Sequence, residues 1–354
     1  MLQQTLSAHR RALHRIAETD RELPRTAAYL KNTLQQLPCT VFSPVGDAVC
    51  AYFDFGKPET VALRSDMDAL PICEQTGLPF ASENAETMHA CGHDGHMAIL
   101  LTLAGLLPSL PTARNVLLVF EPAEETTGGA KPICETGLFE RYHVTRVFGL
   151  HLWPELPKNI VASRAGGMMA RSCELTVTVE GRSVHLAKWR EGADALAAAV
   201  EFITRAYGLA ENLPCLLRFG RMESGEARNS VSKRSVLQGS LRCFDDILFL
   251  KLWNGLQALA DELSEKSGCK FVLSRSEGYP PVTNDAALLT EVRERFPVEE
   301  TAPTFITEDF SEYQKHAPGV FFLLGTGGEP LHSPRFDFDE AVLQTGVSLF
   351  TALL

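Results

Sequence analysis

The chain has 354 residues, of which 45% are hydrophobic and 22% are charged, proportions typical of a globular protein. That length exceeds what a single core usually supports, so we expect two domains or one domain with an insertion. With 44 acidic and 33 basic residues the net charge is −11. No segment concentrates Lys and Arg, which argues against a nucleic-acid partner.

Membrane association is not expected from the sequence. The longest apolar run, residues 97–107, is about half of the ~20 residues that cross a bilayer, and no apolar segment at the N-terminus leads to a cleavage site. We therefore expect a cytoplasmic protein. The nine cysteines are scattered, odd in number and without a CxxC pair, so most are predicted to be reduced, buried hydrophobic residues.

The N-terminal stretch LQQTLSAHRRALHRI predicts an amphipathic surface helix, because its apolar residues recur near helical spacing. Fully apolar runs then alternate with helical patterns. The apolar runs cover residues 60–66, 115–122 and 146–154, and the helical patterns begin at Met97 and cover 131–140. This alternation predicts an α/β domain with a mostly parallel, buried central sheet.

Polar residues lie at the ends of these apolar runs. Asp66 and Asp68 close the first run, Glu124 and Glu125 follow the second, and His151 lies near the end of the third. Ligands of open α/β sheets bind at the carboxyl ends of the strands. We therefore expect these side chains to lie close together.

The pattern changes near residue 170. A strand, an Ala-rich helix over 192–212, two further strands, a helix over 245–267 and a last strand give the order β-α-β-β-α-β of a ferredoxin-like α+β domain. After residue 278 the α/β pattern returns, with a helix near 284–296, the short run PTFI, a helix opening at EDFSEY and the strand GVFFLLG. The prediction is a discontinuous domain of residues 1–168 and 278–354, interrupted by a second domain of residues 169–277.

The segment MHACGHDGH crowds side chains that coordinate metals. Cys91 and His93 are two residues apart, so on an extended segment they would project to the same side. A thiolate with an imidazole suits zinc or a similar transition ion. A CxH pair alone is equally typical of a loop cysteine beside a surface histidine. Asp94 is expected to orient a neighbour or to cap the following helix, and His89 and His96 are expected to be structural.

Other ligand types recur at separate strand ends. Glu124 and Glu125 precede a Gly-Gly turn, and His151 and His332 lie in GLHLWP and EPLHSPRF; each residue alone could be an ordinary surface or core side chain. Together with Cys91 and His93, they exceed the four ligands of a closed structural zinc site. Five ligands and a spare glutamate suit two ions that share a water molecule.

The ordered segments SDMDALP, MHACGHDGH, EPAEETTGGA, GLHLWP, TEDFSEY and LHSPRFDFDE resemble the signatures of a dinuclear metallopeptidase family. That family contains aminoacylases, hippurate hydrolases and hydrolases of indole-acetyl amino acids. The resemblance implies that the metal ligands are Cys91, His93, Glu125, His151 and His332. It further implies that Glu124 is the general acid/base and that Asp68 is the carboxylate that fixes a ligating imidazole.

For the second domain, the resemblance implies a lid that also forms a homodimer. His185 is similar to a lid histidine that stabilises the oxyanion, in the same or the partner subunit. The residues around His185 differ from the family's usual sequence, and the alternative is an ordinary surface histidine. Asn229 resembles a substrate-holding asparagine. Arg242 is a weaker candidate for a carboxylate contact and could be an ordinary strand arginine. At the N-terminus, LHRIAETD lacks the proline of the family's LHxxPE.

The implied reaction is hydrolysis of the amide bond of an N-acyl amino acid, with water activated by two divalent ions and Glu124. Zinc is the expected metal, with manganese, cobalt or nickel as alternatives. Three alternatives stay open at this stage: a carboxypeptidase or dipeptidase, an enzyme with Cys91 as nucleophile, and a non-catalytic metal-stabilised binding protein. The expected partner is a small N-acyl amino acid or peptide, and neither the acyl group nor the amino acid can be read from the motifs.

Overall fold

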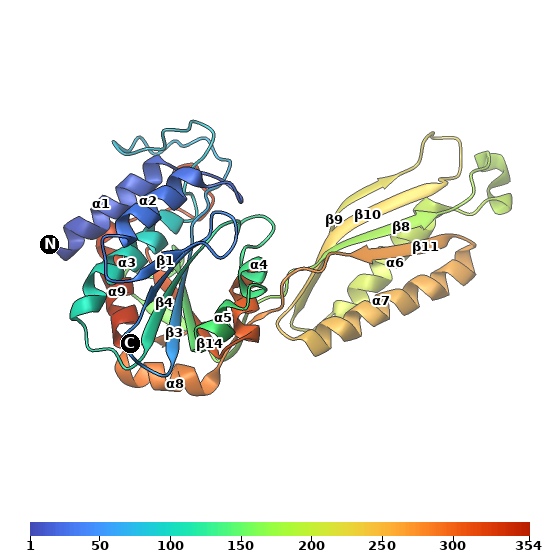
Figure 1. The fold of residues 1–354 in the computed structure, drawn as a ribbon. Coiled ribbons are helices and arrows are strands. Elements are labelled where there is room, and N and C mark those ends of the chain that lie inside the picture. The colour runs from blue at the N-terminus through green and yellow to red at the C-terminus, as the bar shows by residue number, and fades with distance from the viewer. The chain divides into compact units, whose positions relative to one another are not determined.

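The computed structural model describes residues 1–354 and divides the chain into two compact units (Figure 1). The first unit comprises Met1–Gly166, Thr283–Ala302 and Asp309–Leu354, and the second comprises Gly167–Val282 and Pro303–Glu308. The first unit is therefore discontinuous, and most of the second is one insertion. The sequence-based limits assign residues 303–308 to the first domain, whereas the structure places them in the second unit, where Ala170 N donates to Ile306 O at 3.0 Å.

An eight-stranded sheet forms the centre of the first unit, in the order β1-β2-β4-β3-β5-β14-β6-β13. Its four middle strands β4, β3, β5 and β14 pair in parallel. The pairs β1–β2, β2–β4 and β14–β6 are antiparallel, and β6 pairs in parallel with β13. The predicted mostly parallel sheet is thereby confirmed. The bounds of the strands are β1 (Thr40–Phe42), β2 (Val49–Phe53), β3 (Thr60–Asp66), β4 (Asn115–Glu121), β5 (Val144–Trp153), β6 (Val161–Ser163), β13 (Glu299–Glu300) and β14 (Gly319–Gly325).

Helices cover both faces of this sheet, which is why β3, β4 and β14 are buried along their whole length. Figure 1 shows α1, α2, α3 and α9 gathered on one side and α4 and α5 on the other. The helices of this unit are α1 (Leu2–Arg15), α2 (Pro24–Leu34), α3 (His93–Leu106), α4 (Ala130–Cys134), α5 (Leu138–Arg141), α8 (Ala286–Arg295) and α9 (Leu343–Ala352), with short 3-10 helices η1 (Leu107–Ser109), η3 (Asp309–Lys315) and η4 (Glu340–Val342).

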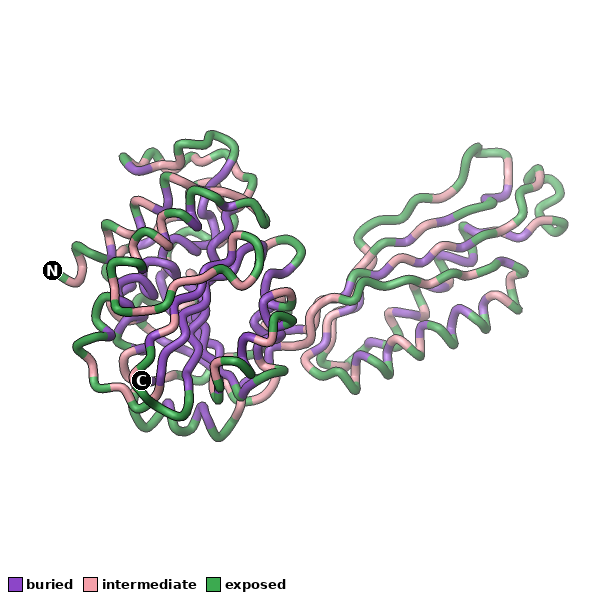
Figure 2. The backbone as a smooth tube through the Cα atoms, in the orientation of Figure 1, coloured by how far each residue is buried: buried purple, intermediate pink, exposed green.

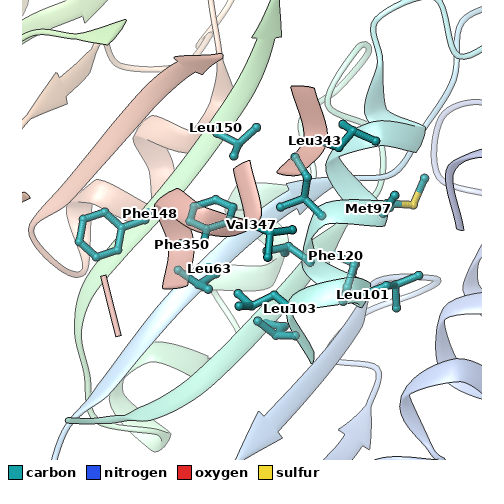
Figure 3. Packing of buried hydrophobic residues seen from close by; sticks show 14 of the residues in the cluster. Leu63, Met97, Leu101, Leu103, Phe120, Phe148, Leu150, Leu343, Val347 and Phe350 are labelled. Atoms are coloured by element: carbon teal, nitrogen blue, oxygen red, sulfur yellow. The ribbon is translucent and has the colours of Figure 1, made fainter. Parts of the chain in front are cut away.

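The core lies between the sheet and the helices α3 and α9 (Figure 3). Leu63 and Phe120 come from adjacent parallel strands, and Val347 and Phe350 come from α9; all are buried. The two helices approach closely at Gly346, where a Cβ atom would lie 2.5 Å from Ile99 Cδ1. A side chain at this position would force Ile99 to move, so the glycine allows the close packing of the two helices.

Several predicted helix limits are wrong, and each has a local cause. α3 begins at His93 rather than at Met97, because Gly92 adopts a left-handed φ of 82° and occupies the N-cap position. The single helix expected over residues 131–140 is divided into α4 and α5 at Gly137, whose φ is 71°. The segment opening at EDFSEY forms the 3-10 helix η3 instead of an α-helix. α2 and the β1–β2 hairpin were not predicted.

The second unit has the predicted ferredoxin-like order. Its strands β8 (Glu174–Glu180), β9 (Cys215–Ser224), β10 (Arg234–Cys243) and β11 (Lys270–Arg275) form an antiparallel sheet in the order β11-β8-β10-β9. α6 (Ala195–Ala210) and α7 (Asp246–Ser267) supply buried side chains to its core. β8 alternates buried and more exposed residues (Figure 2), as expected for a sheet with one covered face.

The remaining elements are η2 (Leu186–Glu191), β7 (Gly166–Met169) and β12 (Val282–Asn284). β7 and β12 lie where the chain passes from one unit to the other. None of the helices combines the length and the hydropathy needed to cross a bilayer.

We predict that Phe322→Ala lowers the free energy of unfolding by about 3–5 kcal/mol, because Phe322 is fully buried in β14 and its removal leaves a cavity. Leu106→Ala at the partly exposed end of α3 is the control, with an expected change within about 0.5 kcal/mol. Urea unfolding of both variants measures the difference. Equal losses would contradict the assignment of Phe322 to the core.

Candidate metal centre

Side chains of metal-binding type gather where β3, β4 and β5 end. Within the first unit, three groups have ligand atoms within 4.8 Å of one another: Cys91, Glu125 and His332; His93, Glu124 and Glu125; and Asp66, His93, His96 and His151. Cys91 Sγ also lies 3.3 Å from His151 Nε2. Because the groups share His93 and Glu125, they form one continuous cluster. It contains the five proposed ligands and Glu124.

A tight turn places Cys91 and His93 in this cluster. The prediction that the two residues lie on an extended segment is wrong: Cys91 is in a turn, and His93 is the first residue of α3. Gly92 between them has φ 82°, and a Cβ atom there would lie 3.0 Å from Leu152 Cδ1. The thiol and the imidazole therefore converge because the backbone reverses at a glycine.

The loop after β4 carries Glu124 and Glu125 and is held by Asp68. One carboxylate oxygen of Asp68 accepts from Glu124 N and the other from Glu125 N, both at 3.1 Å. Ala123, immediately before, has a left-handed φ of 64°, and Gly128 N closes the loop onto Ala123 O at 2.9 Å. A non-glycine residue in this conformation is strained, so the surrounding contacts must hold the loop in place.

His332 comes from the C-terminal part of the chain and has a left-handed φ of 63°. Its backbone N donates to Ala90 O at 2.8 Å, which joins its loop to the turn of Cys91. The imidazole Nε2 lies 3.2 Å from Glu125 Oε1, and the side chain is half exposed. His332 thus covers the solvent side of the cluster.

Two buried histidines turn Nε2 toward the cluster. His93 Nδ1 donates to Asp68 O at 2.8 Å, and His151 Nδ1 donates to Leu152 O at 2.7 Å. These bonds assign an Nδ1 proton to each ring and orient Nε2 inward, as in metal-ligating histidines. His151 Nε2 contacts the Cys91 thiol at 3.3 Å. His93 Nε2 is buried without a hydrogen-bond partner. An orphaned buried nitrogen of this kind fits a bound cation.

His96 differs, because both of its ring nitrogens are occupied. Nδ1 donates to Asp66 Oδ1 at 2.6 Å, and Nε2 accepts from Leu152 N at 2.9 Å. No lone pair is left for a metal ion. His96 therefore acts as a structural link between Asp66 and the end of β5.

Asp68 relates to His93 differently from the expected carboxylate–imidazole pair. The backbone carbonyl of Asp68 takes the His93 proton, and the carboxylate Oδ1 lies 3.6 Å from Nδ1. The carboxylate bonds instead to the two glutamate amides. One residue thus orients both a histidine and the loop of Glu124.

The cluster carries an excess of negative charge. Burial works against protonation of His93, but the carboxylates of Asp66, Asp68 and Glu125 raise its pKa to about 10. A field that favours a proton on this ring equally favours a metal ion. Burial, followed by the charges of Glu125 and Glu124, raises the pKa of the Cys91 thiol well above its usual range. Cys91 would be a thiolate only beside a cation, which disfavours it as a free nucleophile.

Gly92 occupies the N-cap position of α3, and Asp94 in the first turn accepts from Gly95 N through Oδ1 at 2.9 Å. Its Oδ2 accepts from Arg10 Nε at 3.2 Å and from His14 Nδ1 at 2.8 Å. Arg10 is fully buried, donates to Asp337 Oδ1 at 2.6 Å and lies over the Phe338 ring at 3.8 Å. The N-terminal helix thereby links the start of α3 to the segment that follows His332.

The other three predicted site residues belong to the second unit. His185 is exposed, and its Nδ1 accepts from Ala187 N at 3.2 Å. Asn229 is exposed, and its backbone O accepts from Leu186 N at 3.0 Å. Arg242 Nη1 donates to Phe305 O at 2.8 Å. Their roles in the reaction stay predictions.

Asp66 lies in the cluster as expected from its place at a strand end, whereas sequence reasoning missed the part of Arg64. Asp66 contacts His96 and lies 3.6 Å from His93 Nε2, and Arg64 is fully buried beside it. A usable signal was present, since TVALRSD places an arginine in the middle of an otherwise apolar strand.

Comparisons of the sequence with known proteins identify a family of hydrolases. A sequence model of the peptidase family M20/M25/M40 matches residues 62–354. An uncharacterized hydrolase of Staphylococcus aureus (strain bovine RF122 / ET3-1) is 32% identical over 381 residues, covering 99% of this chain and 97% of that protein.

Comparisons with solved structures identify the same family. The YxeP protein of Bacillus subtilis, described as a dinuclear metal-binding peptidase of the M20 family, is similar at 28% identity and a TM-score of 0.89, with 99% of this chain and 97% of that chain covered. The aminobenzoyl-glutamate utilization protein of Klebsiella pneumoniae shares the fold at 20% identity and a TM-score of 0.66, with 98% and 94% covered.

We predict that His14 makes the stability of the protein depend on pH. Burial lowers the pKa of His14, but Asp94 and Glu74 outweigh this effect and raise it to about 9. His14 thus binds its proton more tightly in the folded chain than in the unfolded one, whose pKa is about 6.5. Its contribution, about 3 kcal/mol, is complete below about pH 6.5 and is lost as the pH rises through about 9.

Urea unfolding between pH 6 and pH 10 measures this effect. The unfolding free energy of the wild type should fall over that range by more than that of His14→Gln. His143→Asn, at an exposed histidine, is the control and should follow the wild type. Parallel curves for the wild type and His14→Gln would contradict the prediction.

Proposed function

Because this chain belongs to the peptidase family M20/M25/M40, we propose that it is a two-metal hydrolase that cleaves the amide bond of N-acyl amino acids. One observation carries the proposal: five ligand-type side chains converge beside a sixth, Glu124, which a purely structural site would not need. The resemblance to a dinuclear metal-binding peptidase supports the number of ions.

The residues that would hold the ions are Cys91, His93, Glu125, His151 and His332. When bound, two divalent ions would supply Lewis-acid polarisation of the amide carbonyl and an acidified water molecule. We propose zinc, because a thiolate and three imidazoles suit its preference for sulfur and nitrogen ligands, with manganese, cobalt or nickel as alternatives.

The side chains of the protein perform the proton transfers. Glu124 takes a proton from the attacking water and returns it to the departing amine. Asp68 fixes the backbone of Glu124 and Glu125, so the carboxylate is positioned before substrate binds. His185 is proposed to donate to the oxyanion. Asn229 and Arg242 are proposed to hold the substrate.

A homodimer through the second unit is part of the proposal. Leu196 and Val200 lie one turn apart on α6 and are about half exposed, so they offer an apolar surface to a partner copy. The geometry of that dimer would decide whether His185 reaches the metal centre of its own subunit or that of the partner subunit. A cytoplasmic location also remains a prediction.

We predict that Glu124→Gln lowers kcat by at least about 10³-fold, because general acid/base transfer is lost while the side-chain shape is kept. Zinc content, measured by atomic emission, should equal that of the wild type. Glu135→Gln changes an exposed glutamate after α4 and should retain full activity. Turnover by Glu124→Gln within tenfold of the wild type would refute the role of Glu124.

We predict that metal removal abolishes hydrolysis and that two equivalents of zinc restore it. The assay is a panel of N-acetyl amino acids, hippurate-like aromatic amides and dipeptides with the metal-reconstituted protein, read by release of the free amino acid. Cleavage of dipeptides alone would replace the aminoacylase assignment with a dipeptidase. Activity that survives a chelator but not thiol alkylation would favour Cys91 as a nucleophile instead.

A further inference from the structure

Arg64 is an unusual residue for its position. It lies in the middle of β3, where all seven residues are buried, and it is 1% exposed. A buried guanidinium must be paired to be tolerated. Nothing in the proposed reaction uses Arg64, so its burial needs a separate explanation.

Three carboxylates from three chain segments surround this guanidinium. Arg64 Nη1 donates to Asp66 Oδ2 at 2.9 Å, at the end of its own strand. Arg64 Nε donates to Glu121 Oε2 at 2.8 Å, at the end of β4. Arg64 Nη2 donates to Asp309 Oδ1 at 3.0 Å, at the start of η3. All three carboxylates are fully buried.

Two of these carboxylates lead directly to the metal centre. The second oxygen of Asp66 accepts from His96 Nδ1 at 2.6 Å, and Asp66 Oδ2 lies 3.6 Å from the bare Nε2 of His93. The second oxygen of Asp309 accepts from Ala130 N at 3.1 Å. Ala130 is the first residue of α4, so this hydrogen bond fixes the far end of the loop that carries Glu124.

The third carboxylate is shared with a tyrosine. Glu121 Oε2 also accepts from Tyr313 OH at 2.9 Å, and Tyr313 is fully buried in η3. Arg64 and Tyr313 thus connect β4 to η3 through one oxygen. Only an arginine can donate in three directions within one plane, because a lysine ammonium lacks the rigid fork.

We propose that Arg64 is a positioning residue of the metal centre. Its guanidinium holds Asp66 against His93 and His96, and it holds Asp309 against the loop of Glu124. The ligands are therefore oriented before a metal ion arrives. The inference rests on the proposed function only in that the cluster binds divalent ions, and it requires no particular substrate.

The test measures zinc affinity by competition with a chromophoric chelator, using purified full-length Arg64→Lys. We expect a 10- to 100-fold loss of affinity, the range typical of residues that orient ligands, with the far-UV circular dichroism of the wild type. In zinc-saturated protein, kcat should fall more than KM rises. Arg146→Lys is the control, because Arg146 on β5 pairs with the exposed Glu291 and should leave zinc affinity unchanged.

Wild-type zinc affinity in a folded Arg64→Lys variant, even with a lower unfolding midpoint, would overturn the proposal and leave Arg64 a purely structural residue. If Arg64→Lys does not fold, the zinc affinity of Asp309→Asn tests the proposal instead, because this substitution keeps the shape of the side chain and removes one charge. Weaker zinc binding by Asp309→Asn supports the proposal, and unchanged binding overturns it. Because zinc affinity is read without substrate, absence of amide hydrolysis would refute the proposed function alone.

Discussion

The candidate centre depends on the parallel pairing of β4, β3 and β5. In this register Asp66 pairs with Glu121, and Arg64 pairs with Gly149 two residues before His151. Parallel strands end at the same edge of a sheet, so residues that follow separate strands become neighbours. Had β4 run antiparallel to β3, Glu124 and Glu125 would lie at the opposite edge from Asp68.

Burial of so much charge imposes a second constraint. His93, His151 and Cys91 are removed from water, so each polar atom must have a partner or a bound ion. The backbone carbonyls of Asp68 and Leu152 accept the Nδ1 protons of His93 and His151. The buried carboxylates of Asp66, Asp94 and Asp309 accept hydrogen bonds from arginines. The unpartnered Nε2 of His93 then faces the carboxylates of Asp66 and Glu125, which is an environment suited to divalent cations.

Predictions from the sequence succeeded where a signal is local. The apolar runs at residues 60–66 and 115–122 became β3 and β4, and the alternating pattern of CELTVTVEG became β8. They failed where a glycine conformation decides: Gly137 divides the expected helix over 131–140, and Gly92 turns the chain between Cys91 and His93. Whether a glycine adopts a positive φ depends on its surroundings, which spacing alone does not contain.

The sequence by itself determined the fold class, the order of the motifs and the residue types that could bind metal, because periodicity and motif spacing are properties of the chain. Only the tertiary structure decided which of these residues meet. It separated His93 and His151, whose Nε2 atoms face the other ligand-type side chains, from His96, whose two nitrogens bond to Asp66 and to the backbone of Leu152. It also joined Arg64 to Asp309 across 245 positions. Such contacts arise from packing, and no local pattern encodes them.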